Sequence, residues 1–465
     1  MGGGLGEWLC VVLCSSPPRL LWGSERINEQ AGPLLVWSAF SSSAGCQAGA
    51  IHPMQVGPFY LLDPSNFSHL YGNDLPWAID SVPFFEASDG AFTEAFAFRW
   101  KLFKQHIVAT PGTWNNHPAP SYVVTEFDPT VKVGQGGAYN TISCAAMHHI
   151  SEGRWLRNRQ VISDYGAFWM RGDGDPRGYT FAPAYSLMEL ARVHGTTELA
   201  VSVLPELLAN FEKWHHGNYV PEQGLFYQTD TADGGEDSIS GSGLRPSINF
   251  AMIAEQRSLA YLFNQTKNAT AAHYFANAAN ELQRRTVKQL WSPAMQFFGV
   301  VAWPYPPNCT SRKMGANHGD DPVSHTLSRC AGAPVWKNGT MPPVRELFAL
   351  STPYYFHGLD GLEDLQELSN FSKMWEQLID GQGFSAHFGP RTAERRSSLY
   401  NFTCPHACLW NAPSWPFETS RVASGLANYL TESQRPAVSS TLVSRKAPLA
   451  VGPQQYYSLM TNYTR

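Results

Sequence analysis

Apolar residues recur at helical spacing along most of the chain from about residue 54. One stripe is formed by Phe92, Phe96, Trp100 and Phe103, and Asp89 stands where the N-cap of that helix is expected. The same periodicity predicts ten further helices, at residues 141–152, 157–171, 182–194, 198–215, 247–264, 270–291, 344–350, 362–380, 416–430 and 451–463.

These helices are of similar length and are joined by uneven loops, without βαβ alternation, a phosphate-binding glycine loop or a solenoid repeat. The pattern favours an all-α fold, either a toroid of helical hairpins or an open helical array. A toroid of six hairpins needs twelve helices, so the eleven predicted helices leave it one short at the C-terminal end. Residues 292–342 break the rhythm with prolines and glycines, and we predict a long excursion there with a short hairpin around Phe297–Trp303.

The domain organisation follows from the same pattern. Residues 1–53 have weak periodicity and are expected to form a poorly structured segment, while residues 54–465 form one helical domain.

Composition narrows the class of protein. The 465 residues carry a net charge of −5, which excludes a broad electrostatic grip on nucleic acid. Charged residues make up only 15% and aromatic residues 13%, so the chain can bury a large core and still line a binding site with rings. The longest apolar runs are far shorter than the ~18 residues of a membrane helix.

Eight Asn-x-Ser/Thr sequons suggest a glycoprotein of the secretory pathway, because composition alone would give roughly three. Among the eight cysteines, Cys309 with Cys330 and Cys404 with Cys408 are plausible local disulfides, although the last pair could also be read as part of a zinc site. The N-terminus argues the other way, because it has no basic segment and only a short apolar stretch, so it makes an unconvincing signal peptide. We expect a secreted or secretory-lumen protein in which residues 1–53 are a mis-assigned start that replaces a true leader.

The most unusual stretch for chemistry contains four carboxylates within eight positions: Asp230, Asp233, Glu236 and Asp237. Glycines flank them and a predicted helix follows, which is the setting in which catalytic groups often lie. Crowded carboxylates repel, so at least one pKa should rise into the range that a general acid needs. A solvated acidic turn or a calcium loop is the alternative, although the spacing does not fit an EF-hand.

Two further stretches carry candidate binding residues. Trp410 and Trp415 flank a proline turn that opens a helix, and indole faces stack well on the apolar faces of sugar rings. A packed core turn explains the same residues equally well. His148 and His149 are adjacent and so do not share a helix face, which argues against a metal site. Arg154 and Trp155, which follow them, are candidates for a substrate site or for structural pairing.

In combination, these stretches resemble the six-hairpin (α/α)6 glycosidases, which include trehalase, the processing α-glucosidases and mannosylglycerate hydrolase. The resemblance spans about residues 75–465 and is carried by residues 152–157, 224–230, 233–249, 392–396 and 409–417. It implies an all-α (α/α)6 toroid that acts on a carbohydrate without a metal or organic cofactor.

The resemblance also implies roles for individual residues. The family's Asp-Asn-Ser acid motif corresponds to Glu236-Asp237-Ser238, which makes Glu236 the general acid and Asp237 the backup. Asp233 would bind a hydroxyl or tune the acid. Trp410 and Trp415 match the family's tryptophan element, in which Asn411 replaces an arginine. Arg154, Trp155 and Arg245 are further substrate-binding candidates.

Hydrolysis with inversion is the implied reaction, with the acid and a base carboxylate ~6.5–9.5 Å apart. The family's base lies after the helix that follows the tryptophan element, about where this chain ends, so we expect a C-terminally truncated toroid. Glu394 and Glu418 remain possible stand-ins for this base, but neither matches the family's base motif, so neither is assigned that role.

Two rival functions remain open. A sugar-binding pseudoenzyme would have the aromatic site without a base. A terpene cyclase would share a helical architecture, but the paired Asp-rich motifs of that class are absent from the sequence.

Overall fold

The computed structural model describes residues 62–114, 120–130, 137–306, 336–362, 365–402, 409–433 and 451–464. Most of these residues are helical. The α-helices are α2 (Ser68–Tyr71), α3 (Leu75–Ser81), α4 (Gly90–Gln105), α5 (Ser143–Gly153), α6 (Arg159–Arg171), α7 (Pro183–His194), α8 (Glu198–Ser202), α9 (Leu204–Asn218), α10 (Pro246–Gln265), α11 (Ala269–Leu290), α12 (Leu347–Tyr355), α13 (Leu365–Ser372), α14 (Pro416–Ser433) and α15 (Pro453–Thr464). Short 3-10 turns accompany them, the longest being η7 (Lys373–Leu378).

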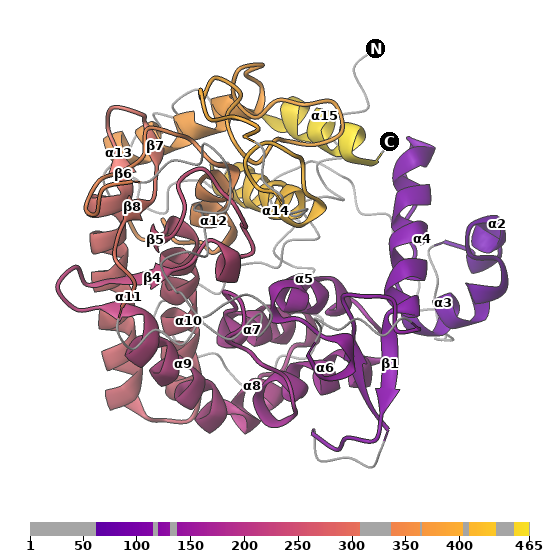
Figure 1. Ribbon diagram of the computed structural model, residues 1–465. Helices are drawn as coiled ribbons and strands as arrows, with labels where there is room; N and C mark the ends of the chain where they lie inside the picture. The colour runs from indigo at the N-terminus through magenta and orange to yellow at the C-terminus, as the bar shows by residue number, and fades with distance from the viewer. Residues whose placement is uncertain are drawn as a thin grey trace, which may run out of the picture.

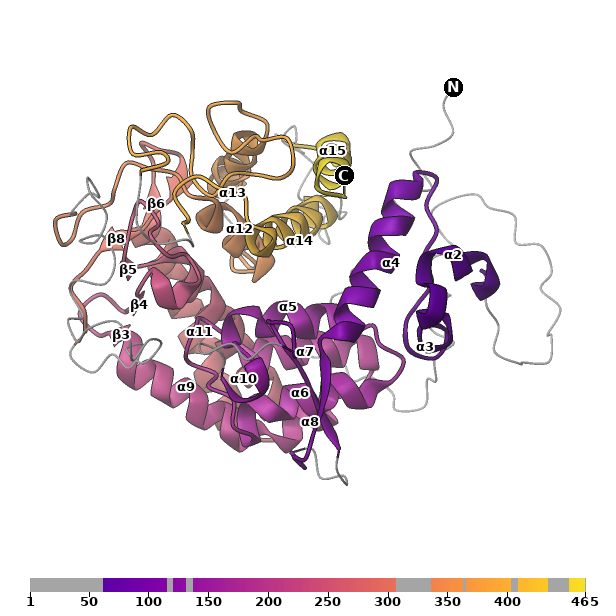
Figure 2. The same cartoon turned by 45° about the vertical axis from the view of Figure 1, so that its right-hand side comes forward.

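The helices follow one another around a ring. From α4 the chain passes through α6, α8 and α9 to α10 and α11, and then returns through α12 and α14 (Figures 1 and 2). Helices that are neighbours in space pack against each other, most extensively α10 with α11 and α12 with α14. The all-α toroid expected from the sequence is therefore confirmed. None of the helices in the described ranges combines the length and the apolar character that crossing a bilayer requires.

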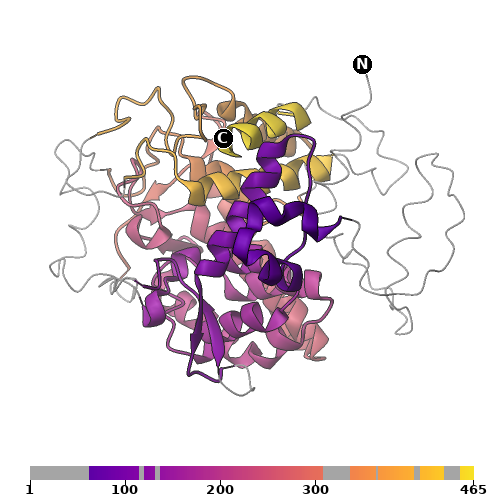
Figure 3. The same ribbon diagram turned by 90° about the vertical axis from the view of Figure 1, so that its right-hand side faces the viewer.

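The last described helix lies beside the first long one. Residues of α15 contact both α14 and α4, and the rings of Phe92 and Tyr457 are 5.8 Å apart. Figure 3 shows α15 next to α4 from the side on which they meet. The ring of helices is thus closed by a contact between segments more than three hundred residues apart in the sequence.

Local sequence explains where the helices begin and which face they bury. The side chain of Asp89 accepts a hydrogen bond from the amide of Ala91 and caps α4, as predicted. In α9 a stripe of apolar side chains at helical spacing is buried, with Leu207, Phe211 and Trp214 all at most 5% exposed.

Two local expectations differ from the structure. The helix predicted over 198–215 is divided between α8 and α9, because Pro205 lies in the first turn of α9 and cannot donate the hydrogen bond that would continue α8. The hairpin near residue 300 is also placed differently. β6 (Trp291–Ser292) pairs with β7 (Phe297–Phe298), whereas β8 (Val301–Ala302) leaves the hairpin and joins another sheet.

That other sheet carries the acidic stretch. It consists of β3 (Tyr219–Val220), β4 (Leu225–Gln228), β5 (Gly243–Leu244) and β8, all antiparallel. Gly243 is needed at this position because a Cβ atom would lie 2.3 Å from the carbonyl oxygen of Val301. The sheet therefore fixes both ends of the loop formed by residues 229–242. A separate hairpin, β1 (Ile107–Thr110) with β2 (Ser121–Val124), packs on α6.

Several expectations lie outside the described residues. These are the N-terminal segment 1–53, the middle of the 292–342 excursion, the sequon at Asn308, and the cysteine pairs Cys309–Cys330 and Cys404–Cys408.

Candidate active site

The four clustered carboxylates lie on the loop between β4 and β5, and they differ in accessibility. Asp230, Asp233 and Asp237 are 0%, 6% and 9% exposed, whereas Glu236 is partly exposed. Glu236 is therefore the carboxylate of this loop that a ligand can reach most readily.

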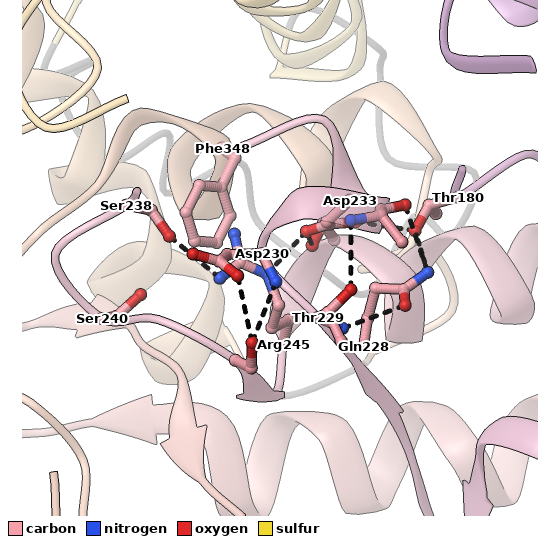
Figure 4. Close-up of polar contacts among 12 residues, drawn as sticks. Thr180, Gln228, Thr229, Asp230, Asp233, Ser238, Ser240, Arg245 and Phe348 are labelled. Atoms are coloured by element: carbon pink, nitrogen blue, oxygen red, sulfur yellow. Dashed lines mark hydrogen bonds and ion pairs between the residues drawn. The ribbon is translucent and has the colours of Figure 1, made fainter. Parts of the chain in front are cut away.

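Asp233 is held on both of its oxygens. Its Oδ1 accepts a hydrogen bond from Thr180 Oγ1 at 2.7 Å, and its Oδ2 accepts from Arg245 Nε at 2.7 Å and from Ser247 Oγ (Figure 4). With three donors engaged and only 6% of the residue exposed, Asp233 contributes a fixed buried charge near the loop rather than an open contact to a hydroxyl.

Arg245, which the resemblance makes a substrate-binding candidate, lies in the interior of the protein. It is fully buried, with its guanidinium 4.3 Å from the centre of the Phe348 ring. Besides Asp233, it donates to Ser238 Oγ at 3.2 Å and to the carbonyl of Gly241. Arg245 therefore ties three points of the acidic loop together.

The predicted rise in a carboxylate pKa is found at Asp230. Burial raises the pKa of Asp230 to about 7, opposed by the positive charge of Arg245 and reinforced by Asp237. Its Oδ1 accepts from Ser242 Oγ at 3.1 Å, and its buried Oδ2 has no hydrogen-bond partner among the described residues. Burial is the main cause, whereas the sequence argument relied on repulsion between neighbouring carboxylates.

Glu346, which sequence reasoning missed, holds the other side of the loop. It is the N-cap residue of α12 and is 3% exposed. Its carboxylate accepts from the amide of Ser240 at 3.3 Å and from Ser240 Oγ, while Trp336 Nε1 donates to the carbonyl of Ile239 at 2.8 Å. A buried glutamate before a helix gives no local signal, and Ser240 lies 106 positions away.

Glu236 lies against the tryptophan element. The amide of Trp410 donates to the carbonyl oxygen of Glu236 at 2.9 Å, and the Tyr179 hydroxyl lies 3.5 Å from Glu236 Oε1. Across the loop, a Cβ atom on Gly234 would lie 2.8 Å from Cys144 Sγ. Burial raises the pKa of Cys144 well above its usual value, and the negative charges of Glu126 and Glu236 raise it further.

Glu126 is therefore a further acidic residue near Cys144, and the sequence did not reveal it. It follows β2, and its side chain is exposed, yet the protein atoms around it raise its pKa to about 7. Glu126 and Glu236 both act on Cys144 although 110 positions separate them in the sequence.

The two tryptophans stack on each other beside Glu236. Their ring centroids are 6.0 Å apart with an angle of 15° between the planes. Trp410 is 6% exposed, whereas Trp415 is partly exposed and donates its Nε1 hydrogen to the carbonyl of Leu409 at 2.7 Å. The structure thus brings Glu236, Trp410 and Trp415 together.

Asp237, the backup acid, has a φ of 55°, in the left-handed region that Asp adopts more readily than most residues. This conformation and its burial distinguish it from its neighbour Glu236. Asn411 is fully buried and donates to the carbonyl of Phe402 at 2.9 Å, so it is engaged within the protein.

Arg154 and Trp155 lie elsewhere. They follow the C-terminal end of α5, whose N-terminal end carries Cys144 beside the acidic loop, so roughly 15 Å of helix separates the two regions. Arg154 pairs with Glu189 Oε2 at 3.1 Å and lies 5.5 Å from the centre of the Trp155 ring. The structure does not bring these two residues to Glu236.

The carboxylates considered as stand-in bases are engaged by arginines. Glu394 is 3% exposed and pairs with Arg345 at 2.8 Å, and Glu418 is 1% exposed, with Arg421 at 3.4 Å. Both contacts are structural.

The adjacent histidines are partly buried. His149 Nδ1 lies 3.1 Å from the Tyr165 hydroxyl, and burial lowers the pKa of His149 to about 3. In the portion of the chain that the structure describes, no group of His, Cys, Asp and Glu side chains has the arrangement of a metal site.

Comparison with known proteins places these residues in context. The family model of the mannosylglycerate hydrolase MGH1-like glycoside hydrolase domain matches residues 138–465. A solved structure titled "Sialidase" has a TM-score of 0.68 at 24% identity, over 87% of this chain and 34% of that one. The mannosylglycerate hydrolase of Thermus thermophilus, solved with glucose, gives 0.38 at 13% identity, over 54% and 63%. No curated protein matches.

The likeness to the structure titled "Sialidase" concerns the fold alone. That structure shares the helical architecture over most of this chain, and this chain spans about a third of its length.

Proposed function

The chain belongs to the family of mannosylglycerate hydrolase MGH1-like glycoside hydrolase domains, and we propose that it hydrolyses a glycosidic bond with Glu236 as the general acid. The observation that carries this proposal is the contrast within one loop. Asp230, Asp233 and Asp237 are buried, while Glu236 is partly exposed next to two stacked tryptophans.

In the proposed reaction, Glu236 donates its proton to the glycosidic oxygen as the bond between that oxygen and the anomeric carbon breaks. Water adds to the anomeric carbon and gives its proton to a base carboxylate.

We propose inversion of configuration, as in the glycosidases that the sequence resembles, with the base on the opposite face of the sugar from Glu236. Glu394 and Glu418 are poor choices for this base because arginines hold both of them in the interior. The base is left unassigned.

A sugar-binding protein without hydrolase activity is the second candidate. The engagement of Glu394 and Glu418 favours it, because an accessible second carboxylate is what an inverting enzyme needs.

Hydrolysis of a panel of aryl α-glycosides by the wild-type chain and by Glu236→Gln tests the proposal. We expect the variant to lose about 100-fold or more of the activity while keeping its melting temperature. Asp237→Asn is the matched control and should keep most of the activity. Undiminished hydrolysis by Glu236→Gln would reject the acid assignment, and sugar binding without hydrolysis by the wild-type chain would support the second candidate.

We also propose that the protein is an N-glycosylated protein of the secretory pathway. The described sequon asparagines are Asn66, Asn264, Asn268, Asn338, Asn370, Asn401 and Asn462, and six of the seven are exposed, Asn370 being half-buried. Four asparagines outside sequons are buried instead: Asn210, Asn218, Asn249 and Asn411. The sequons therefore lie where glycans can be accommodated without disturbing the core.

Expression in insect cells behind a secretion leader tests this second proposal. Peptide N-glycosidase should lower the mass of the secreted protein by several glycans, and Asn268→Gln should remove one of them. A mass that the glycosidase does not change would contradict the proposal.

A further inference from the structure

Phe388 and His387 form an exposed pair of rings near the tryptophan element. Phe388 is 67% exposed, the largest fraction among the exposed large apolar residues of the described chain, and His387 beside it is exposed as well. Their rings are 4.4 Å apart at an angle of 77°. The exposed Phe388 ring offers an apolar face that a ligand can cover.

Backbone contacts hold this pair against the tryptophan element. Gly389 packs so closely on the turn before Trp415 that a Cβ atom would lie 2.7 Å from Ser414 Oγ, and its φ of 145° also favours glycine. Three residues later, the amide of Thr392 donates to the carbonyl of Pro413 at 3.2 Å. The segment that carries Phe388 is therefore fixed beside Trp415.

The exposed fraction of the aromatic side chains increases from Trp410 through Trp415 to Phe388. Trp410, next to Glu236, is 6% exposed, Trp415 is partly exposed, and Phe388 is 67% exposed. Since Trp415 Nε1 is engaged by the carbonyl of Leu409, the free part of Trp415 is its ring. Polar groups accompany the rings, because Ser414 and His387 are both exposed.

We propose that Trp415, Phe388 and His387 form an outer sugar-binding surface, which takes a ring of an oligosaccharide beyond the bond cleaved at Glu236. The axial C–H bonds of a pyranose give it an apolar face that can cover an aromatic ring, while Ser414 and His387 offer hydrogen bonds to its hydroxyls. The substrate class is then an oligosaccharide or glycan rather than a small glycoside. This inference rests on the proposed function.

Calorimetric binding of gluco-, manno- and galacto-oligosaccharides of one to six units tests the surface. We expect affinity to rise with length in at least one series. Phe388→Ala should weaken binding of the longer members by roughly tenfold and leave the monosaccharide unchanged. Phe98→Ala is the matched control, since Phe98 is 62% exposed on α4.

The outcomes separate the two proposals. Glu236→Gln should keep the length-dependent binding although it loses hydrolysis. Hydrolysis retained by Glu236→Gln would therefore contradict the assignment of Glu236 as general acid and would leave the outer sugar-binding surface untouched. Equal affinities of Phe388→Ala and the wild-type chain for every length would overturn the outer surface. Absence of length-dependent binding by the wild-type chain would overturn it too.

Discussion

The amide of Trp410 donates a hydrogen bond to the carbonyl oxygen of Glu236 at 2.9 Å. This bond joins two segments that lie 174 positions apart, and it does not depend on either side chain. The tryptophan element is therefore positioned against the acidic loop by backbone geometry, and the side chains of both segments are brought to one place as a consequence.

The buried pair of Arg245 and Asp233 should be essential for stability. Breaking a buried ion pair leaves one charge uncompensated, so we expect Asp233→Asn or Arg245→Met each to lower the free energy of unfolding by about 3–5 kcal/mol. Denaturant unfolding of both single variants and of the double variant checks this, and the double should lose less than the sum.

The pair of Asp380 and Arg396 provides the control for this experiment. Both side chains are about a third exposed or more, so Asp380→Asn should change the free energy by less than about 1 kcal/mol. Equal losses of unfolding free energy in Asp233→Asn and Asp380→Asn would contradict the larger contribution expected of the buried ion pair.

Asp230 should make stability depend on pH. Burial raises its pKa from 3.8 to about 7, so the folded chain keeps a proton that the unfolded chain releases. The contribution of this group to stability therefore falls as the pH rises from about 4 to about 7 and stays low above that range.

Unfolding of wild-type protein and of Asp230→Asn at pH 5 and pH 8 isolates this effect, because other groups contribute equally to both. We expect the wild-type chain to lose more stability between these two pH values than the variant. A parallel change in both proteins would mean that Asp230 ionises in the folded state as readily as in water.

Gly389 should be hard to replace. Its positive φ and the 2.7 Å approach of a Cβ atom to Ser414 Oγ predict that Gly389→Ala destabilises the protein by about 1–3 kcal/mol. Gly381, eight residues earlier, has open space around its Cβ position, so Gly381→Ala should be nearly neutral. Thermal unfolding of the two variants distinguishes them, and similar melting temperatures would argue against the close packing at Gly389.

The two tryptophans should differ in their effect on stability. Trp410 is 6% exposed, so Trp410→Ala should cost about 3–5 kcal/mol, and Trp415→Ala should cost less because its ring is partly exposed. Trp410→Phe should be milder than Trp410→Ala, because Trp410 Nε1 is buried without a hydrogen-bond partner among the described residues. Denaturation midpoints should rank the variants in this order, and a larger loss at Trp415 would contradict it.

Much of the fold was predictable because helices are encoded locally. The stripe that ends in Trp214 and the cap at Asp89 act over a few residues, so their effect is visible in a short window. The site was only partly predictable. Glu236 and Trp410 lie in unusual stretches of the sequence. No local pattern around Arg245 predicts that its side chain is fully buried.

The residues that were missed act across long separations. Glu346 binds Ser240 over 106 positions, and Glu126 and Glu236 both raise the pKa of Cys144 although 110 positions separate them. Patterns of hydrophobic spacing report which face of an element is buried and not which distant side chain it meets.

The meeting of α4 with α15 has a consequence for how the protein is made. Phe92 leaves the ribosome long before Tyr457 is synthesised. During most of synthesis, α4 therefore lacks its contact with α15. Closing so long a loop is entropically unfavourable and slow, and this contact should be among the last to form. Nascent chains stalled before residue 453 should therefore expose the α4 surface to chaperones and proteases.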